Sequence, residues 1–87
     1  MNKYEKTPEA IIDLHGHTRD TAGGVIKDLV RDKKYGHVRI ITGRAAFREG
    51  GPVLRLFVKD YLEKHRIKFA QSKLEDGGEG AFEVFLK

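Results

Sequence analysis

The sequence predicts a two-layer α/β sandwich of order βαβαββ, in which a four-stranded mixed sheet carries two helices on one face. Three observations predict it. Four short segments are rich in β-branched or aromatic residues, as strands are. Two longer segments between them repeat apolar residues at helical spacing. The 87 residues suffice for one domain and leave no third layer to cover the other sheet face.

The chain is expected to begin with a polar segment. We predict a flexible N-terminal tail over residues 1–9 and a single domain over residues 10–87. The first strand is predicted over residues 10–15, where Ile11, Ile12 and Leu14 supply the apolar side chains. Gly16 is expected to end it.

The first helix is predicted to follow Thr18, a residue type that commonly caps helix N-termini. Its apolar positions are spaced i, i+3, i+4, i+7 and i+8 from Ala22 to Val30. Gly36 suits the C-terminal cap. Gly23 and Gly24 interrupt this pattern, and each costs about 0.5–1 kcal/mol relative to Ala. Either the helix begins late or its backbone must approach a neighbour there.

The second half of the chain contains one helix and three strands. A strand is predicted over residues 38–42, followed by a loop over residues 43–51. Pro52 fits the first turn of a helix whose apolar stripe extends to Leu62. A third strand over residues 67–74, a Gly-rich turn and a fourth strand through Phe82, Val84 and Leu86 predict an antiparallel hairpin.

The charge distribution points to an anionic partner. The total of 17 Lys and Arg against 13 Asp and Glu gives a net charge of +4. Residues 31–59 hold eight basic and two acidic residues, so the surplus is concentrated in the middle of the chain. Such a segment favours nucleic acid as a partner, although a solvated surface has the same composition. The absence of Cys excludes disulfides and thiol chemistry. No signal peptide or membrane span is recognisable.

The carboxyl end of the first strand is the first candidate site. Asp13 and His15 fall on one face of the strand, opposite Ile12 and Leu14, which we expect in the core. A carboxylate two residues from an imidazole can orient it and fix its tautomer. Gly16 lets the backbone pass close to a ligand. A turn or capping arrangement without chemistry is the alternative for this pattern.

The loop after the second strand is the second candidate site, because parallel strands present their carboxyl ends at one edge. Arg44 and Arg48 can each donate several hydrogen bonds to phosphate oxygens. Phe47 can stack on a base or cover the core. We therefore expect this loop to lie beside Asp13 and His15.

Four motifs carry a resemblance to a known family. Residues 13–16 (DLHG) resemble the signature of the Smr domain, the small MutS-related domain. Residues 39–44 (RIITGR) resemble its second strand with the following TGxG or HGxG loop, and residues 51–55 (GPVLR) its G-x-V-L-R helix start. Residues 77–81 (GGEGA) resemble its closing hairpin. Each motif alone is weak, but four in this order over about residues 10–87 are specific.

The resemblance implies a fold similar to the C-terminal domain of bacterial translation initiation factor three. It also implies nucleic-acid binding and, as in several members, endonuclease or nicking activity. The Asp and His of the signature correspond to Asp13 and His15, which are the predicted catalytic residues. The glycine loop corresponds to Gly43 and Arg44. The predicted nucleic-acid or phosphate contacts are Gly16, His17, Gly43, Arg44, Arg48 and Arg55.

One departure from the family pattern leaves two functions open. Ala45 stands where the loop has its second glycine, which would reshape the loop if that position needs a positive φ. The first hypothesis is an endonuclease that cleaves RNA or structured DNA. The second is a non-catalytic module that binds nucleic acid or the ribosome through the open sheet face and the basic loop. Protein docking through that face is a third and weaker alternative.

The expected cofactor depends on the substrate. RNA cleavage can use the 2′-hydroxyl as nucleophile without metal, whereas DNA favours a metal-activated water. A divalent ion such as Mg²⁺ or Mn²⁺, if required, would be held by Asp13 and His15. The expected partners are DNA or RNA, with the ribosome or a larger repair assembly as wider settings and no membrane. The expected location is cytoplasmic.

Overall fold

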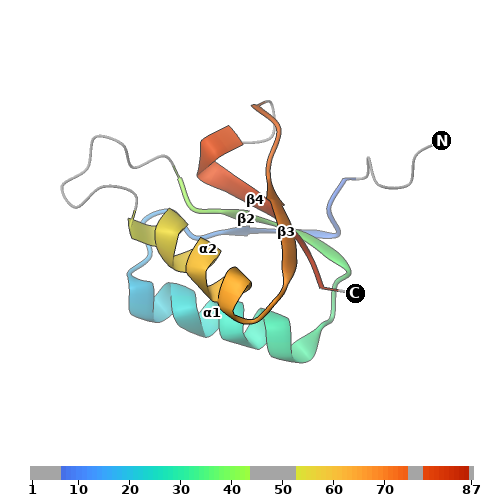
Figure 1. Cartoon of the computed structure of the whole chain (residues 1–87). Coiled ribbons are helices and arrows are strands. Elements are labelled where there is room, and N and C mark those ends of the chain that lie inside the picture. The colour runs from blue at the N-terminus through green and yellow to red at the C-terminus, as the bar shows by residue number, and fades with distance from the viewer. Residues whose placement is uncertain (1–6, 44–52, 75–77, 87) are drawn as a thin grey trace.

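The computed structural model describes residues 7–43, 53–74 and 78–86. Its elements are β1 (Ala10–Asp13), α1 (Arg19–Asp32), β2 (His37–Ile41), α2 (Val53–Lys64), β3 (Lys68–Gln71), the short 3₁₀ helix η2 (Gly78–Gly80) and β4 (Ala81–Phe85). The four strands form one sheet, and both helices lie on one of its faces (Figure 1). The predicted fold class and the βαβαββ order are confirmed. No helix in the described part of the chain is long and apolar enough to cross a membrane.

The sheet has the strand order β1-β2-β4-β3. Strands β1 and β2 are parallel, while β4 is antiparallel to both β2 and β3. The first three strands therefore share one direction, as the two helical crossovers require. The carboxyl ends of β1 and β2 consequently lie at the same edge, which is where the sequence places the candidate site.

The core lies between the sheet and the helices. On the sheet side it is built by Leu14, Ile40 and Val84, and on the helix side by Ile26 and Val58. Leu14 is only 1% exposed, whereas Asp13 before it and His15 after it are exposed. The alternation predicted for this segment is therefore confirmed, although the paired strand ends at Asp13 rather than at residue 15.

The first helix begins as predicted and ends earlier than predicted. Thr18 is its N-cap, with a reciprocal pair of hydrogen bonds to Thr21. The predicted cap at Gly36 is wrong, because Lys33 adopts the left-handed conformation with φ 46° and closes the helix. The backbone N–H of Gly36 instead donates to the carboxylate of Glu9, which also accepts a hydrogen bond of 3.0 Å from the N–H of His37.

The glycine pair in α1 has an explanation at one of its two positions. The helix begins at Arg19, so Gly23 lies in its interior. A Cβ at Gly23 would lie 3.2 Å from Cζ of Phe57 on α2, so the missing side chain lets the two helices approach. A Cβ at Gly24 would meet nothing within 4 Å, and the structure gives no reason for glycine there.

The other predicted boundaries are close to those observed. The second strand begins one residue earlier than predicted, at His37. The third covers Lys68–Gln71 rather than residues 67–74, and the predicted hairpin with β4 is confirmed. The backbone N–H of Glu9, inside the predicted tail, donates to the carbonyl of His37 at 2.8 Å.

Candidate functional site

Asp13 and His15 form a hydrogen-bonded pair at the carboxyl end of β1. The Oδ1 atom of Asp13 lies 2.6 Å from Nδ1 of His15 and accepts a second hydrogen bond of 3.1 Å from the backbone N–H of His15. The side chains keep 64% (His15) and 49% (Asp13) of their surface exposed. The two residues are thus held by hydrogen bonds to each other, while much of both side chains faces solvent.

The electrostatics of the pair fix its tautomer. The side-chain and backbone hydrogen bonds from His15 lower the pKa of Asp13, so this carboxyl is ionised at neutral pH and can only accept hydrogen bonds. The hydrogen atom between the two groups therefore lies on Nδ1 of His15. In the neutral ring Nε2 then carries the lone pair and is directed away from Asp13, which is the form that a general base needs.

Gly43 packs against the back of His15. It follows β2, has φ 81°, and a Cβ built on it would lie 3.2 Å from Cβ of His15. The backbone N–H groups of Thr42 and Gly43 both donate to the carbonyl of Gly80, at 2.8 and 3.0 Å. The loop after β2 was predicted to lie beside the first motif. Gly43, which begins that loop and is among the described residues, does lie beside His15. Gly80, which belongs to the GGEGA motif but was not among the predicted site residues, fixes the position of Gly43.

The segment after His15 turns sharply and starts α1. Gly16 has φ 84°, and the backbone N–H of His17 donates to the carbonyl of Leu14 at 2.9 Å. The Nδ1 atom of His17 lies 3.2 Å from Oγ1 of Thr21 in the first turn of α1. Thr21 was not among the predicted site residues, and its spacing from the cap, T-x-x-T, was the available signal.

The predicted arginines fall in different places. Arg55 on α2 donates to Oε1 of Gln71 at 3.2 Å, and its guanidinium carbon lies 5.4 Å from the ring centre of Phe82. These contacts link α2 to the sheet. The predicted contacts Arg44 and Arg48 lie outside the described residues, as do Ala45 and Phe47.

The open sheet face carries a charged network centred on Glu83. Its carboxylate lies 2.6 Å from Nε2 of His37, accepts a hydrogen bond of 2.7 Å from Nε of Arg39, and accepts another from the hydroxyl of Ser72. Burial opposes the charge on Glu83, but these three hydrogen bonds outweigh it and lower its pKa. His37 also stacks on Phe85, with ring centres 4.9 Å apart.

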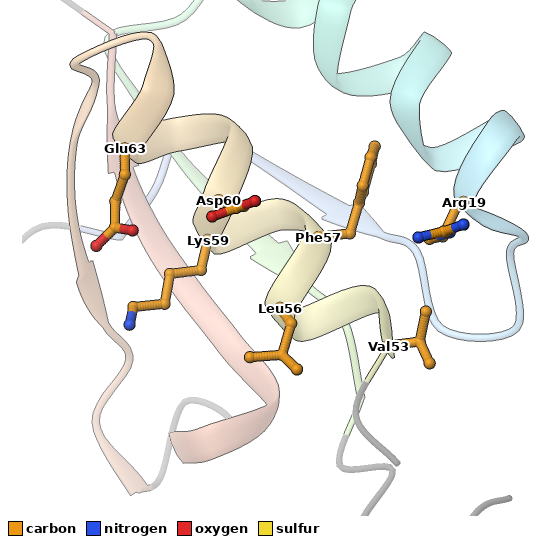
Figure 2. Close-up of a pocket in the computed structure, with 7 residues that line it drawn as sticks. All are labelled: Arg19, Val53, Leu56, Phe57, Lys59, Asp60 and Glu63. Atoms are coloured by element: carbon orange, nitrogen blue, oxygen red, sulfur yellow. The ribbon is translucent and has the colours of Figure 1, made fainter. Parts of the chain in front are cut away.

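A groove runs along α2 on the helix layer, next to the start of α1 (Figure 2). It encloses about 460 Å³. Its apolar part includes Leu56, which is 55% exposed, and Arg19 of α1 lies at the end where α2 begins. The lining residues are Arg19, Val53, Leu56, Phe57, Lys59, Asp60 and Glu63.

The chemistry available to a metal ion at Asp13 and His15 is limited. Within residues 7–43, 53–74 and 78–86 there is no group of three or more His, Asp or Glu side chains able to hold an ion. Asp13 already directs Oδ1 to His15, so the pair offers one free carboxylate oxygen and one ring nitrogen. These donors would not hold Mg²⁺, which requires octahedral oxygen ligation, without several waters or substrate oxygens.

Comparison with protein families gives one match. The family model described as the Smr domain matches residues 12–87. No curated protein sequence matches.

Solved structures with the same fold are Smr domains. The Smr domain of Thermus thermophilus MutS2 superposes with a TM-score of 0.73 at 24% identity, covering 90% of this chain and 98% of that one. The B3BP Smr domain gives 0.71 at 26% identity over 92% and 80% of the two chains. The SMR domain of NEDD4-binding protein 2 gives 0.70 at 25% identity over 94% and 90%.

Proposed function

Because the chain belongs to the Smr domain family, which is known in nucleic-acid-binding and nuclease-like proteins, we propose that it is an endonuclease that cleaves phosphodiester bonds in RNA or structured DNA. The observation that carries the proposal is the exposed pair formed by Asp13 and His15. It is the arrangement that an acid–base reaction requires: an oriented imidazole whose outer nitrogen is open to a substrate.

The role of each residue follows from its contacts. His15 takes the proton from the attacking oxygen through Nε2, since Nδ1 is held by Asp13. Asp13 keeps the ring in this tautomer and stabilises the imidazolium that forms. Gly43 packs against His15, since a Cβ built on Gly43 would lie 3.2 Å from Cβ of His15. Arg44 and Arg48 are proposed to bind the scissile phosphate, as their place in the sequence after β2 suggests.

Cleavage of matched RNA and DNA substrates tests the proposal. We expect the parent protein to cleave at least one of them and His15→Ala to reduce the rate by about 100-fold or more. His65→Ala is the matched control, because His65 is an exposed histidine at the end of α2, where its ring packs on Tyr61. Comparing reactions with and without a chelator reports whether an added divalent ion is needed. Absence of cleavage of both substrates would refute the enzyme proposal.

A second candidate function rests on Ala45, which replaces a glycine of the family loop. If that change disables cleavage, the domain would bind nucleic acid without cutting it. Binding would then weaken with salt, survive His15→Ala, and lose about one phosphate contact in each of Arg44→Ala and Arg48→Ala. A ribosome or repair assembly as the wider partner, and a cytoplasmic location, stay predictions.

A further inference from the structure

A second histidine stands beside the proposed base. His17 follows His15 by two residues, so their Cα atoms are at most about 7 Å apart. The positive φ of Gly16 and the hydrogen bond from the His17 N–H to the Leu14 carbonyl fold this segment into a turn at the carboxyl edge of the sheet. Both imidazoles are therefore exposed at one edge, on either side of a single glycine.

His17 is held in place through one of its ring nitrogens. Its Nδ1 atom lies 3.2 Å from Oγ1 of Thr21. That oxygen also accepts a hydrogen bond of 3.1 Å from the Thr18 N–H and lies 3.1 Å from the Thr18 carbonyl oxygen. The hydroxyl has one hydrogen and three neighbours that can accept it, namely the Thr18 carbonyl, the Thr18 hydroxyl and Nδ1 of His17. Whichever of them receives it, Nδ1 of His17 is engaged by Thr21. Nε2 of His17 is then the ring nitrogen available to a ligand.

The two rings have chemically different partners. An ionised carboxylate holds His15, and it only accepts hydrogen bonds, so in the neutral ring Nε2 of His15 is the acceptor. A hydroxyl holds His17 through Nδ1, so Nε2 is the nitrogen through which this ring, as the imidazolium, can give up a proton. A pair of imidazoles in opposite protonation states is what acid–base cleavage needs near neutral pH.

We propose that His17 is the general acid that protonates the leaving oxygen when RNA is cleaved, with His15 as the base. The inference rests on the proposed endonuclease function. His15 takes the proton of the 2′-hydroxyl, the 2′-oxygen forms a bond to phosphorus, and the bond from phosphorus to the 5′-oxygen breaks. The 5′-oxygen receives the Nε2 proton of His17. The products are a 2′,3′-cyclic phosphate and a 5′-hydroxyl, with the proton now on His15.

A substrate that needs no general acid tests this role. In RNA whose leaving 5′-oxygen is replaced by sulfur, the thiolate departs without protonation. We expect the His17→Ala variant to cleave ordinary RNA about 100-fold more slowly than the parent. It should cleave the sulfur substrate at close to the parental rate. His15→Ala should be slow on both substrates, and His65→Ala should match the parent on both. Thr21→Val, which removes the anchor of His17, should give a smaller loss that the sulfur substrate also restores.

The outcomes separate this inference from the proposed function. If His17→Ala cleaves ordinary RNA at the parental rate, or is equally slow on both substrates, His17 is not the general acid, while the role of His15 stands. If the parent cleaves DNA but not RNA, this inference fails and the endonuclease proposal survives. If the parent cleaves neither, both fail. Circular dichroism of each variant separates a catalytic loss from a folding defect.

Discussion

Gly43→Ala is the substitution that most directly tests how the site is assembled. It has two costs. The backbone at φ 81° disfavours any residue with a Cβ, by about 1–2 kcal/mol of folding free energy. The new Cβ would also lie 3.2 Å from Cβ of His15, so one of the two chain segments must move by a few tenths of an ångström. We therefore expect lower stability together with a displaced His15.

A thermodynamic cycle isolates the contact from the backbone cost. Urea unfolding of Gly43→Ala is measured in the parent and in two other backgrounds, His15→Ala and His15→Gly. Only glycine at position 15 removes the contacted Cβ, so the cost of Gly43→Ala should fall by about 0.5–1 kcal/mol there and stay unchanged with alanine. Gly16→Ala is the control for φ alone, since its φ is 84° and its Cβ would meet nothing within 4 Å.

The same displacement should slow catalysis. Misplacing a reacting group by about 1 Å can cost about 100-fold in rate, so a shift of about 0.3 Å corresponds to about four-fold. Cleavage by Gly43→Ala is measured under conditions where the variant is fully folded. An equal stability cost of Gly43→Ala in all three His15 backgrounds would refute the proposed contact between Gly43 and His15.

Three further predictions concern the helix contact, the open sheet face and the orienting carboxylate. Gly23→Ala should destabilise the fold by about 1 kcal/mol, because its Cβ would lie 3.2 Å from the Phe57 ring. Gly24→Ala should stabilise the fold by about 0.5–1 kcal/mol, because its Cβ would meet nothing within 4 Å and Ala favours a helix over Gly. Urea unfolding measures both changes. Hydrogen bonds lower the folded-state pKa of Glu83 below 4.5, so its stabilising contribution is present above pH 4.5 and disappears as the pH falls through the folded-state pKa. Glu83→Gln should therefore lose about 2–3 kcal/mol at neutral pH and show a weaker loss of stability in acid. Asp13→Asn should keep the fold, measured by circular dichroism, and lose about 100-fold or more in cleavage rate, because a neutral amide no longer fixes the His15 tautomer.

Much of the fold was predictable because local and periodic signals agreed. The apolar stripe of α2 and the Thr18 cap of α1 are visible in sequence, and both helices form where expected. The end of α1 was not predictable in the same way. Gly36 has the residue type that favours a cap, yet its N–H is used by Glu9, 27 residues earlier in the chain. A contact between distant segments thus overrode the local preference, and Lys33 took the left-handed position.

The candidate site was predictable to the extent that it is local. Asp13 and His15 share a strand face by simple alternation, and their hydrogen bond follows from that placement. The anchor of His17 was less visible, because its partner Thr21 already serves the helix cap. The network on Glu83 was not predictable. His37 and Arg39 lie on β2 and Ser72 follows β3, so these side chains reach Glu83 only because β4 pairs with both of those strands.

Three of the four sequence motifs contact one another at the carboxyl edge of the sheet. The first motif supplies His15, and the second supplies Gly43, whose missing side chain lets His15 sit directly against it. The closing-hairpin motif, GGEGA, supplies Gly80, whose carbonyl accepts hydrogen bonds from the N–H groups of both Thr42 and Gly43. Gly80 directly precedes β4, which pairs with β2. Formation of the final hairpin therefore fixes the position of Gly43, and Gly43 in turn limits where His15 can lie. The position of the imidazole therefore depends on the completed sheet, so changes in the last fifteen residues should alter the site without touching a substrate.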